Sequence, residues 1–472
     1  MAGWFWNFRF IRLNRLNGPN GLNRLNRVTD APHILLVNPW IHDFAAYDFW
    51  AKPLGLLVLA ALLRRHGCSV SYVDCLDRFH PRAPAADPQR RCGRGPYLKT
   101  RLPKPAQLPD IPRRFSRYGI KPEWLRQDLQ SLRRPDLILV TSMMTYWYAG
   151  VQETIAVLRD VFADAPVILG GIYATLCRDH ARLTAGADRV VDGAAEAGLL
   201  DILAEVTGFR PAARFDPQDL DTYPHPAHEL QHRIAYVPLL TAKGCPFACA
   251  YCAAKLLNPE RLTRSPEGVV DEISRWHRDV GVRDFVFYDD ALLMQAEHHA
   301  LPILEAVIRR CPKLRFHTPN ALHIRWIAPT VARLMKRAGF ETVRLGLETA
   351  GPSRRPEREQ KVTADEFHRA AACLKQAGFE KHQLGAYLLA GLPGQSFAEV
   401  ATSIQIVKDT GVTPIPAYYS PIPHTDLWPA AVAASRYDLT ADPLFTNNAI
   451  LPCRKESFSW ATITRLKTLA AA

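Results

Sequence analysis

The sequence predicts an α/β protein of two domains, a doubly wound parallel sheet followed by a partial (β/α)6 barrel. Short apolar runs alternate with stretches of helical spacing over residues 31–207, and the same alternation returns over residues 235–430. A Pro- and Asp-rich link at 208–234 lies between the two blocks. A chain of 472 residues is also long enough for two or three domains.

Five short apolar runs predict the strands of the first domain. A long insertion separates the second predicted strand from the third. Most of the other strands are followed by a segment with helical spacing. Parallel strands need crossover helices, so this order predicts a Rossmann-like sheet with helices on both faces. The expected strands are His33–Pro39, Cys68–Cys75, Pro135–Ser142, Pro166–Gly171 and Ala187–Gly193.

Six strand-like segments with helices between them predict the barrel. Reactive groups in such barrels lie at the carboxyl ends of the strands, so we look for chemistry there. We expect no chemistry in the C-terminal extension at 431–472, which is less periodic. The expected strands are Ala235–Cys245, Asp284–Asp290, Leu314–Asn320, Glu341–Thr349, His382–Gly394 and Thr413–Pro423.

The positive charge of the chain is concentrated in two places. Net charge is +13, of which residues 1–30 carry +4 and residues 81–134 carry +10, which leaves about −1 for the rest. The first segment repeats an Arg-Leu-Asn triplet and lacks a signal-peptide pattern, so we expect a disordered tail or misread upstream sequence. The second is a solvated, Pro-rich insertion or a docking surface for an acidic partner or substrate. A nucleic-acid surface over the body is not expected.

Hydropathy and cysteine usage also indicate the cellular compartment that we expect for the protein. No run of about 18 apolar residues occurs, so we expect no membrane span. Seven of the ten cysteines are scattered and no secretory signal precedes them, which favours reduced thiols in the cytoplasm.

The remaining three cysteines carry the chemistry. Cys245, Cys249 and Cys252 fall within eight residues, directly after the first predicted barrel strand. Three thiolates on one loop can hold an iron–sulfur cube and leave one iron open to a substrate. Structural zinc prefers four closed ligands and a redox dithiol needs only two cysteines, so both alternatives fit less well. Chance clustering is the last alternative.

This CxxxCxxC pattern, with an aromatic residue before the last cysteine, resembles the signature of radical S-adenosylmethionine (radical SAM) enzymes. The surroundings resemble the branch with an N-terminal cobalamin-binding-like domain, over about residues 31–430. The resemblance implies a [4Fe–4S] cluster and reductive cleavage of S-adenosylmethionine to a 5′-deoxyadenosyl radical. It also implies an electron donor such as flavodoxin or ferredoxin. The substrate, a small molecule or a peptide, is not named by any motif, and no catalytic residue is assigned.

The same resemblance implies five residues around S-adenosylmethionine. Tyr251 matches the aromatic position near the adenine, and Gly391 lies in the Gly-Leu-Pro-Gly turn that approaches it. Asp289 and Asp290 supply acceptors for the methionine ammonium, although a helix N-cap is the alternative. Glu348 matches a stretch near the ribose. These are expectations carried over from the family.

For cobalamin the resemblance is weaker. Thr141 and Ser142 match hydroxyl positions against the corrin, and Gly170 and Gly171 match small residues that admit the nucleotide tail; ordinary tight turns are the alternative. The Asp-x-His-x-x-Gly motif of one subgroup is missing, and His42 is only a lone histidine at that end of the sheet. The final Gly193-Ala194-Ala195-Glu196 departs from the usual Gly-Glu-x-Glu.

Three functions follow in order. With bound cobalamin, the sequence favours methyl transfer to an unactivated carbon. Without it, another C–H functionalisation or a rearrangement is the alternative. A cluster-bearing scaffold or regulatory protein is the third.

Overall fold

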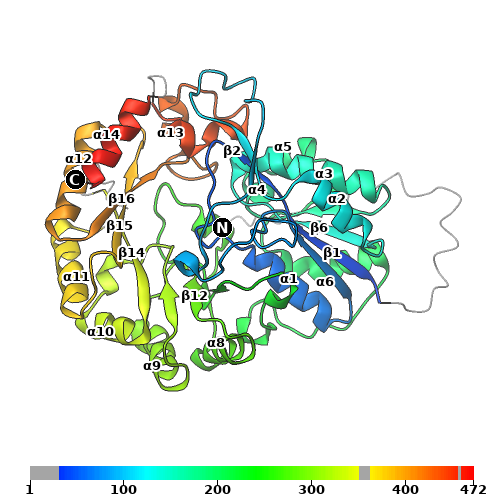
Figure 1. Cartoon of the computed structure of the whole chain (residues 1–472), viewed down its shortest axis with the longest axis horizontal. Helices are drawn as coiled ribbons and strands as arrows, with labels where there is room; N and C mark the ends of the chain where they lie inside the picture. Colours follow the sequence, from blue (N-terminus) through cyan, green and yellow to red (C-terminus); the bar gives the residue numbers. More distant parts are fainter. Residues whose placement is uncertain (1–30, 350–361, 455–458, 472) are drawn as a thin grey trace, which may run out of the picture.

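The computed structural model describes residues 31–349, 362–454 and 459–471. The predicted tail at 1–30 lies outside the described residues. Two sheets lie side by side, one with its helices on the right of Figure 1 and one with helices around its outer side on the left. The fold is α/β, as predicted.

The first sheet has five parallel strands in the order β3-β1-β6-β7-β8. Helices α1 (Leu54–Arg65) and α6 (Ala195–Thr207) cover one face, and α3 (Tyr148–Val161) covers the other. The chain therefore reverses direction along the sheet between β1 and β6, the point where doubly wound sheets bind ligands. The strands are β1 (His33–Asn38), β3 (Ser69–Asp74), β6 (Leu137–Val140), β7 (Val167–Leu169) and β8 (Arg189–Val190).

The second sheet has six parallel strands in the order β16-β15-β14-β13-β12-β9. All five neighbouring pairs are parallel, and helices α8 to α12 lie outside, which makes the predicted partial barrel. The strands are β9 (Val237–Leu239), β12 (Asp284–Phe287), β13 (Arg315–His317), β14 (Phe340–Glu348), β15 (Leu384–Ala390) and β16 (Thr413–Tyr418). The helices are α8 (Pro266–Val280), α9 (Ala300–Arg310), α10 (Pro329–Ala338), α11 (Ala364–Gln376) and α12 (Phe397–Asp409).

Residues from the first domain reach the interior of the barrel. Trp50 is buried and stacks on His317 of β13, with ring centroids 4.5 Å apart. Its indole nitrogen donates to the carbonyl of Cys92 at 2.7 Å, and it packs with Tyr236 and Val286 of the barrel. The two domains are therefore joined through side chains as well as through the link at 208–234.

The basic insertion is more ordered than the expected Pro-rich excursion. Strands β4 (Lys99–Arg101) and β5 (Ser116–Tyr118) form a three-stranded antiparallel sheet with β2 (Ile41–Asp43), and α2 (Pro122–Gln130) packs on the first domain. Strands of three residues are too short for a period-2 pattern to emerge, and their partners are distant in sequence. The sequence therefore misses all three.

The C-terminal extension also has a place beside the site. Helices α13 (Trp428–Ala434) and α14 (Trp460–Ala471) pack on the barrel. Ala431 and Cys453 of the extension pack in one cluster with Tyr251, so the extension contacts the cysteine loop itself. Within the described ranges, the chain has no helix that is both long and apolar enough to cross a membrane.

Candidate functional site

The three cysteines lie on a loop that two short strands close. β10 (Ala242–Lys243) pairs antiparallel with β11 (Leu262–Thr263), so the loop between them leaves and returns at one point beside β9. Gly244 opens the loop with φ +82°, and a Cβ there would lie 2.5 Å from the carbonyl of Glu260. Only glycine fits such a turn without displacing backbone.

The pKa values of the thiols are shifted by neighbouring thiols and by a nearby carboxylate. Burial raises the pKa of Cys245, and Asp290 and Cys249 raise it further. Burial also raises the pKa of Cys252, with Cys245, Asp290 and Glu348 contributing. Arg261 and the backbone of Phe247 lower the pKa of Cys245, but the raising effects prevail. A bound metal centre would stabilise the thiolates in these surroundings.

The ligands that the loop offers are three thiols. No fourth cysteine and no histidine lies between residues 244 and 261. Structural zinc prefers four closed ligands, whereas three thiolates leave one iron of a [4Fe–4S] cluster open to a substrate. The donor set therefore fits an iron–sulfur cluster better than zinc.

Asp289 and Asp290 follow β12 but have different surroundings. The carboxylate of Asp289 is buried and accepts from the Thr241 hydroxyl at 2.5 Å and the Ala242 backbone N–H at 2.7 Å. Burial raises its pKa to about 6. Asp290 instead accepts from the backbone of Gly244 and faces the cysteine loop. Asp289 thus holds the exit of β9, while Asp290 lies next to the thiols.

Glu348 is aimed at the loop by a break in β14. Its φ is +63°, and the pairing of β14 with β15 shifts register between Gly346 and Glu348. A bulge at the end of a strand redirects the side chain. The Glu348 carboxylate hydrogen-bonds the hydroxyl of Tyr251, whose pKa burial and Glu348 together raise. Two residues predicted around S-adenosylmethionine are therefore in contact.

The Gly-Leu-Pro-Gly turn closes the far side of the site. Gly391 has φ +91°, and a Cβ there would lie 3.5 Å from Leu451 of the C-terminal extension. The side-chain oxygen of Gln395 accepts from the backbone N–H of Gly391 at 2.8 Å and of Leu392 at 3.2 Å. The turn is fixed by Gln395, a residue that the sequence analysis did not single out.

A cavity of about 460 Å³ lies between the carboxyl ends of the two sheets. Its barrel side includes Lys243, Tyr288 and Asp290. The four residues predicted to contact cobalamin all line its other side, which includes Thr141, Ser142, Gly170, Gly171 and Gly193. The cavity thus joins the strand ends of the first domain to the entrance of the cysteine loop.

The residues that line this cavity differ in whether they shape the turn or leave space for a ligand. The Ser142 hydroxyl donates to the carbonyl of Gly170 at 2.7 Å and accepts from the Ala174 backbone N–H at 3.3 Å. Gly171 has φ +95°, and a Cβ there would lie 2.3 Å from the Ser142 carbonyl oxygen. These two residues shape the turn, whereas a Cβ on Gly170 would meet only the Val191 carbonyl, at 3.9 Å.

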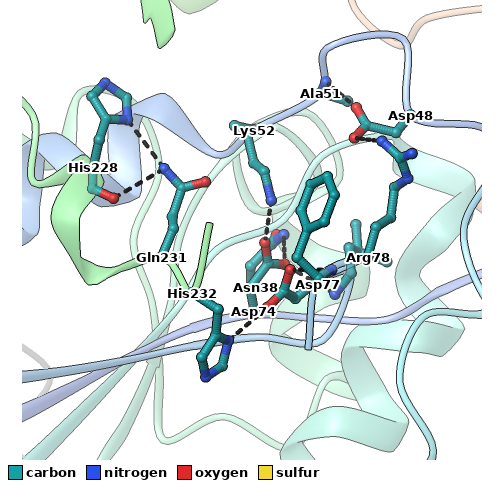
Figure 2. Close-up of polar contacts among 12 residues, drawn as sticks. Asn38, Asp48, Ala51, Lys52, Asp74, Asp77, Arg78, His228, Gln231 and His232 are labelled. Atoms are coloured by element: carbon teal, nitrogen blue, oxygen red, sulfur yellow. Dashed lines mark hydrogen bonds and ion pairs between the residues drawn. The ribbon is translucent and has the colours of Figure 1, made fainter. Parts of the chain in front are cut away.

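Lys52 lines the same cavity from the loop before α1, and its ammonium points away into a buried ion pair (Figure 2). It donates to Asp74 at 2.9 Å, and Asn38 donates to the other oxygen of Asp74 at 2.7 Å. Burial alone would lower the pKa of Lys52, but Asp74, Asp77 and Asp48 raise it overall. Asp74 therefore holds the Lys52 side chain in place and balances its charge at this part of the cavity.

His42 does not line the cavity. It lies on β2, where its Nε2 is 2.6 Å from a carboxylate oxygen of Glu153. Arg117 pairs with the same carboxylate at 2.8 Å. The lone histidine at this end of the sheet therefore belongs to a structural hydrogen-bond network with Glu153 and Arg117.

Sequence reasoning missed two contacts that hold the cysteine loop. Lys243 at its entrance pairs with Glu196 of α6 at 2.5 Å, so the first domain anchors the loop directly. Phe247, inside the loop, stacks on His323 after β13, with ring centroids 4.3 Å apart. Neither contact leaves a local sequence signal, because the partners are 47 and 76 positions away.

Known proteins resemble this chain in sequence and in fold. Residues 239–407 match the Radical SAM superfamily. An uncharacterized methyltransferase of Pyrococcus horikoshii is 26% identical over 336 residues, 63% of this chain and 70% of that protein. The anaerobic magnesium-protoporphyrin IX monomethyl ester cyclase of Rubrivivax gelatinosus is 23% identical over 341 residues, 64% of this chain and 60% of the cyclase.

Among solved structures, the fold resembles the radical S-adenosylmethionine methyltransferase TsrM of Kitasatospora setae with cobalamin and a [4Fe–4S] cluster bound. The TM-score is 0.63 and the identity 18%, over 86% of this chain and 75% of TsrM. The matched segment 239–407 contains the cysteine loop, Asp289, Asp290, Glu348 and Gly391. The chain therefore carries a radical SAM domain, and its two-domain fold resembles that of TsrM.

Proposed function

We propose that this enzyme uses a [4Fe–4S] cluster and cobalamin to transfer a methyl group from S-adenosylmethionine to an unactivated carbon. The observation that carries the proposal is the cavity between the two sheets. Thr141 and Gly170 line one side and Asp290 lines the other, beside the three cysteines. Cofactors held on both domains would therefore meet in one space. When bound, the cluster supplies the electron that cleaves the sulfonium to a 5′-deoxyadenosyl radical, and cobalamin carries the methyl group.

The chain's own residues have distinct roles in this proposal. Cys245, Cys249 and Cys252 hold the cluster, while Asp290 accepts from the ammonium of S-adenosylmethionine. Tyr251 and Glu348, hydrogen-bonded to each other, border the adenosine. Asp289 orients the loop through Thr241 and Ala242 rather than touching the substrate.

The electron would come from a flavodoxin- or ferredoxin-like donor. None of the ten cysteines, all of which lie in the described ranges, forms a disulfide, which agrees with a reducing compartment such as the cytoplasm.

Anaerobic reconstitution tests the cluster. The wild-type protein is expected to gain the visible absorption of a [4Fe–4S] cluster and, with reductant, to release 5′-deoxyadenosine from S-adenosylmethionine. Cys249→Ala should abolish both, whereas Cys373→Ala, a scattered cysteine on α11, should change neither. A colourless zinc-bound protein would refute the proposed cluster.

Retention of hydroxocobalamin during purification tests the second cofactor. Gly170→Val would place a side chain in the cavity without a backbone clash, so it should lower corrin retention. Gly198→Val on α6, where a Cβ meets nothing within 4 Å and no cavity wall is altered, is the matched control.

A wild-type protein that retained no corrin would favour the second candidate, C–H functionalisation without methyl transfer. Two observations support that alternative. The sequence lacks an Asp-x-His-x-x-Gly motif, and one relative is a cyclase.

A further inference from the structure

The basic insertion forms a second cavity, of about 570 Å³ and open to solvent, between the chain before residue 105 and the chain after residue 111. Four of its lining side chains are cationic, and none is acidic: Arg101, Lys104, Arg113 and Arg114. The remaining lining residues are apolar. Residues 81–134 carry an excess of positive charge, and part of that charge therefore lies around this cavity.

Three of these cations, Arg101, Lys104 and Arg114, form no ion pair with any described carboxylate, unlike other arginines of the insertion. Arg117 pairs with Glu153 at 2.8 Å and Arg126 with Asp160 at 2.8 Å. In contrast, the side chains of Arg101 and Arg114 form no hydrogen bond or ion pair with any residue that the structure describes, and Lys104 only donates to the carbonyl of Pro109. Cations that line one cavity repel one another, and an anion bound among them would relieve that repulsion.

Another cavity of the same protein provides the contrast. It measures about 430 Å³ and is lined by three arginines beside α5 (Arg178–Thr184) and β8. Asp188 and Asp192 also line it, and Arg178 pairs with Asp192 at 3.1 Å. The arginines of this cavity are thus accompanied by acids, unlike those that line the cavity of the insertion.

The cationic cavity lies at the rim of the barrel. Arg113 donates to the carbonyl of Ala449 at 2.8 Å, and Phe115 packs in one cluster with Leu451. Leu451 is the side chain that borders Gly391 at the end of β15, and Tyr418 at the end of β16 packs on the same cluster. In Figure 1 this cyan loop lies beside α13, above the open side of the barrel.

We propose that this cavity binds a phosphate or diphosphate group of the substrate, an inference that rests on the proposed radical SAM function. A phosphate or diphosphate group carries about two or more negative charges, and its oxygens accept parallel hydrogen bonds from guanidinium groups. Three arginines and a lysine match that charge, whereas a single carboxylate would balance only one of them. The anion would hold one end of the substrate at the rim, so that another part of it reaches the site below.

Isothermal titration of the full-length protein with inorganic pyrophosphate tests the proposal. The wild-type protein should bind one pyrophosphate saturably, and affinity should fall as salt rises. Arg101→Ala/Arg114→Ala should weaken binding at least tenfold. Arg178→Ala/Arg182→Ala, which removes two arginines from the acid-containing cavity, should leave it unchanged. Equal loss in both double variants, or no saturable binding by the wild type, overturns the proposal.

A second measurement separates this inference from the proposed function. Release of 5′-deoxyadenosine without substrate should be equal in the wild type and in Arg101→Ala/Arg114→Ala, because these residues do not touch the cysteine loop. If 5′-deoxyadenosine is released but pyrophosphate does not bind, the cavity proposal alone fails. If an acidic protein such as flavodoxin binds through Arg101 and Arg114 while pyrophosphate does not, the cavity is a protein-docking surface and the proposal is wrong.

Discussion

Asp289 and Asp290 are adjacent in sequence, yet their carboxylates face different surroundings. Successive residues leaving a strand point to opposite sides, so one carboxylate turns toward Thr241 and the other toward Gly244. The sequence predicts that both accept from the ammonium of S-adenosylmethionine. The contacts instead support separate roles, with Asp289 positioning the loop and Asp290 facing the proposed ligand.

We expect the two asparagine variants to fail differently. Asp289→Asn turns an amide toward N–H donors, which should cost about 1–3 kcal/mol of stability and reduce cluster content. Asp290→Asn should keep the thermal midpoint and the cluster but weaken S-adenosylmethionine binding about tenfold or more. Thermal unfolding, iron content and equilibrium binding measure the three quantities. Equal loss of S-adenosylmethionine binding in both variants, at unchanged stability, would show that both aspartates bind it.

At the scale of single elements, α6 forms two ion pairs with residues that the structure describes, and one of them links the two domains. Glu196 at its start pairs with Lys243, and both side chains are mostly buried, with 12% and 20% exposed. Glu205 near its end pairs with Arg189, and these side chains are 58% and 45% exposed. The same helix therefore offers a shielded pair across domains and a solvated pair within one.

Double-mutant cycles should separate these pairs. For Lys243→Met with Glu196→Gln, we expect a coupling energy of about 1–3 kcal/mol, because partial burial weakens solvent screening. For Arg189→Met with Glu205→Gln, about 0–0.5 kcal/mol is expected. Denaturant unfolding gives both values. Similar coupling in the two cycles would mean that the pair between domains does not stabilise their contact.

At the scale of the whole molecule, the link between the domains contains a histidine that burial keeps neutral. Figure 2 shows His228 beside Gln231, whose amide donates to its Nδ1 at 3.3 Å. The ring is fully buried and lies edge-on to Trp276 of α8, with centroids 5.2 Å apart. Burial lowers its pKa to about 3, and Lys52 and His225 contribute. The folded protein therefore resists protonation at this position.

This histidine should make stability depend on pH. Because its pKa is lower in the folded than in the unfolded chain, its stabilising contribution is complete above about pH 6.5 and is lost as pH falls toward 3. Between pH 6.5 and 5 the loss should reach about 2 kcal/mol. His228→Phe should remove that part of the pH dependence in denaturant unfolding, whereas His382→Phe, an exposed histidine, should not. Parallel wild-type and His228→Phe profiles would contradict this.

Much of the architecture could be predicted because its signals are local. Each buried parallel strand is a short apolar run, and each crossover helix has its own periodicity, so five strands and then six were found in order. The cysteine loop was equally visible, since three ligands lie within eight residues. The three-residue strands β2, β4 and β5 were not, because they exist only through pairing with distant partners.

The sequence by itself determined the order of the elements and the residue types available at the strand ends. Only the tertiary structure decided which of those residues meet. It separated Asp289 from Asp290, joined Tyr251 to Glu348 through a bulge, and paired Lys243 with a helix of the other domain. It also gathered four cations of the insertion around one cavity. Periodicity and spacing act over a few residues, whereas hydrogen bonds, burial and charge balance depend on neighbours that folding brings from far along the chain.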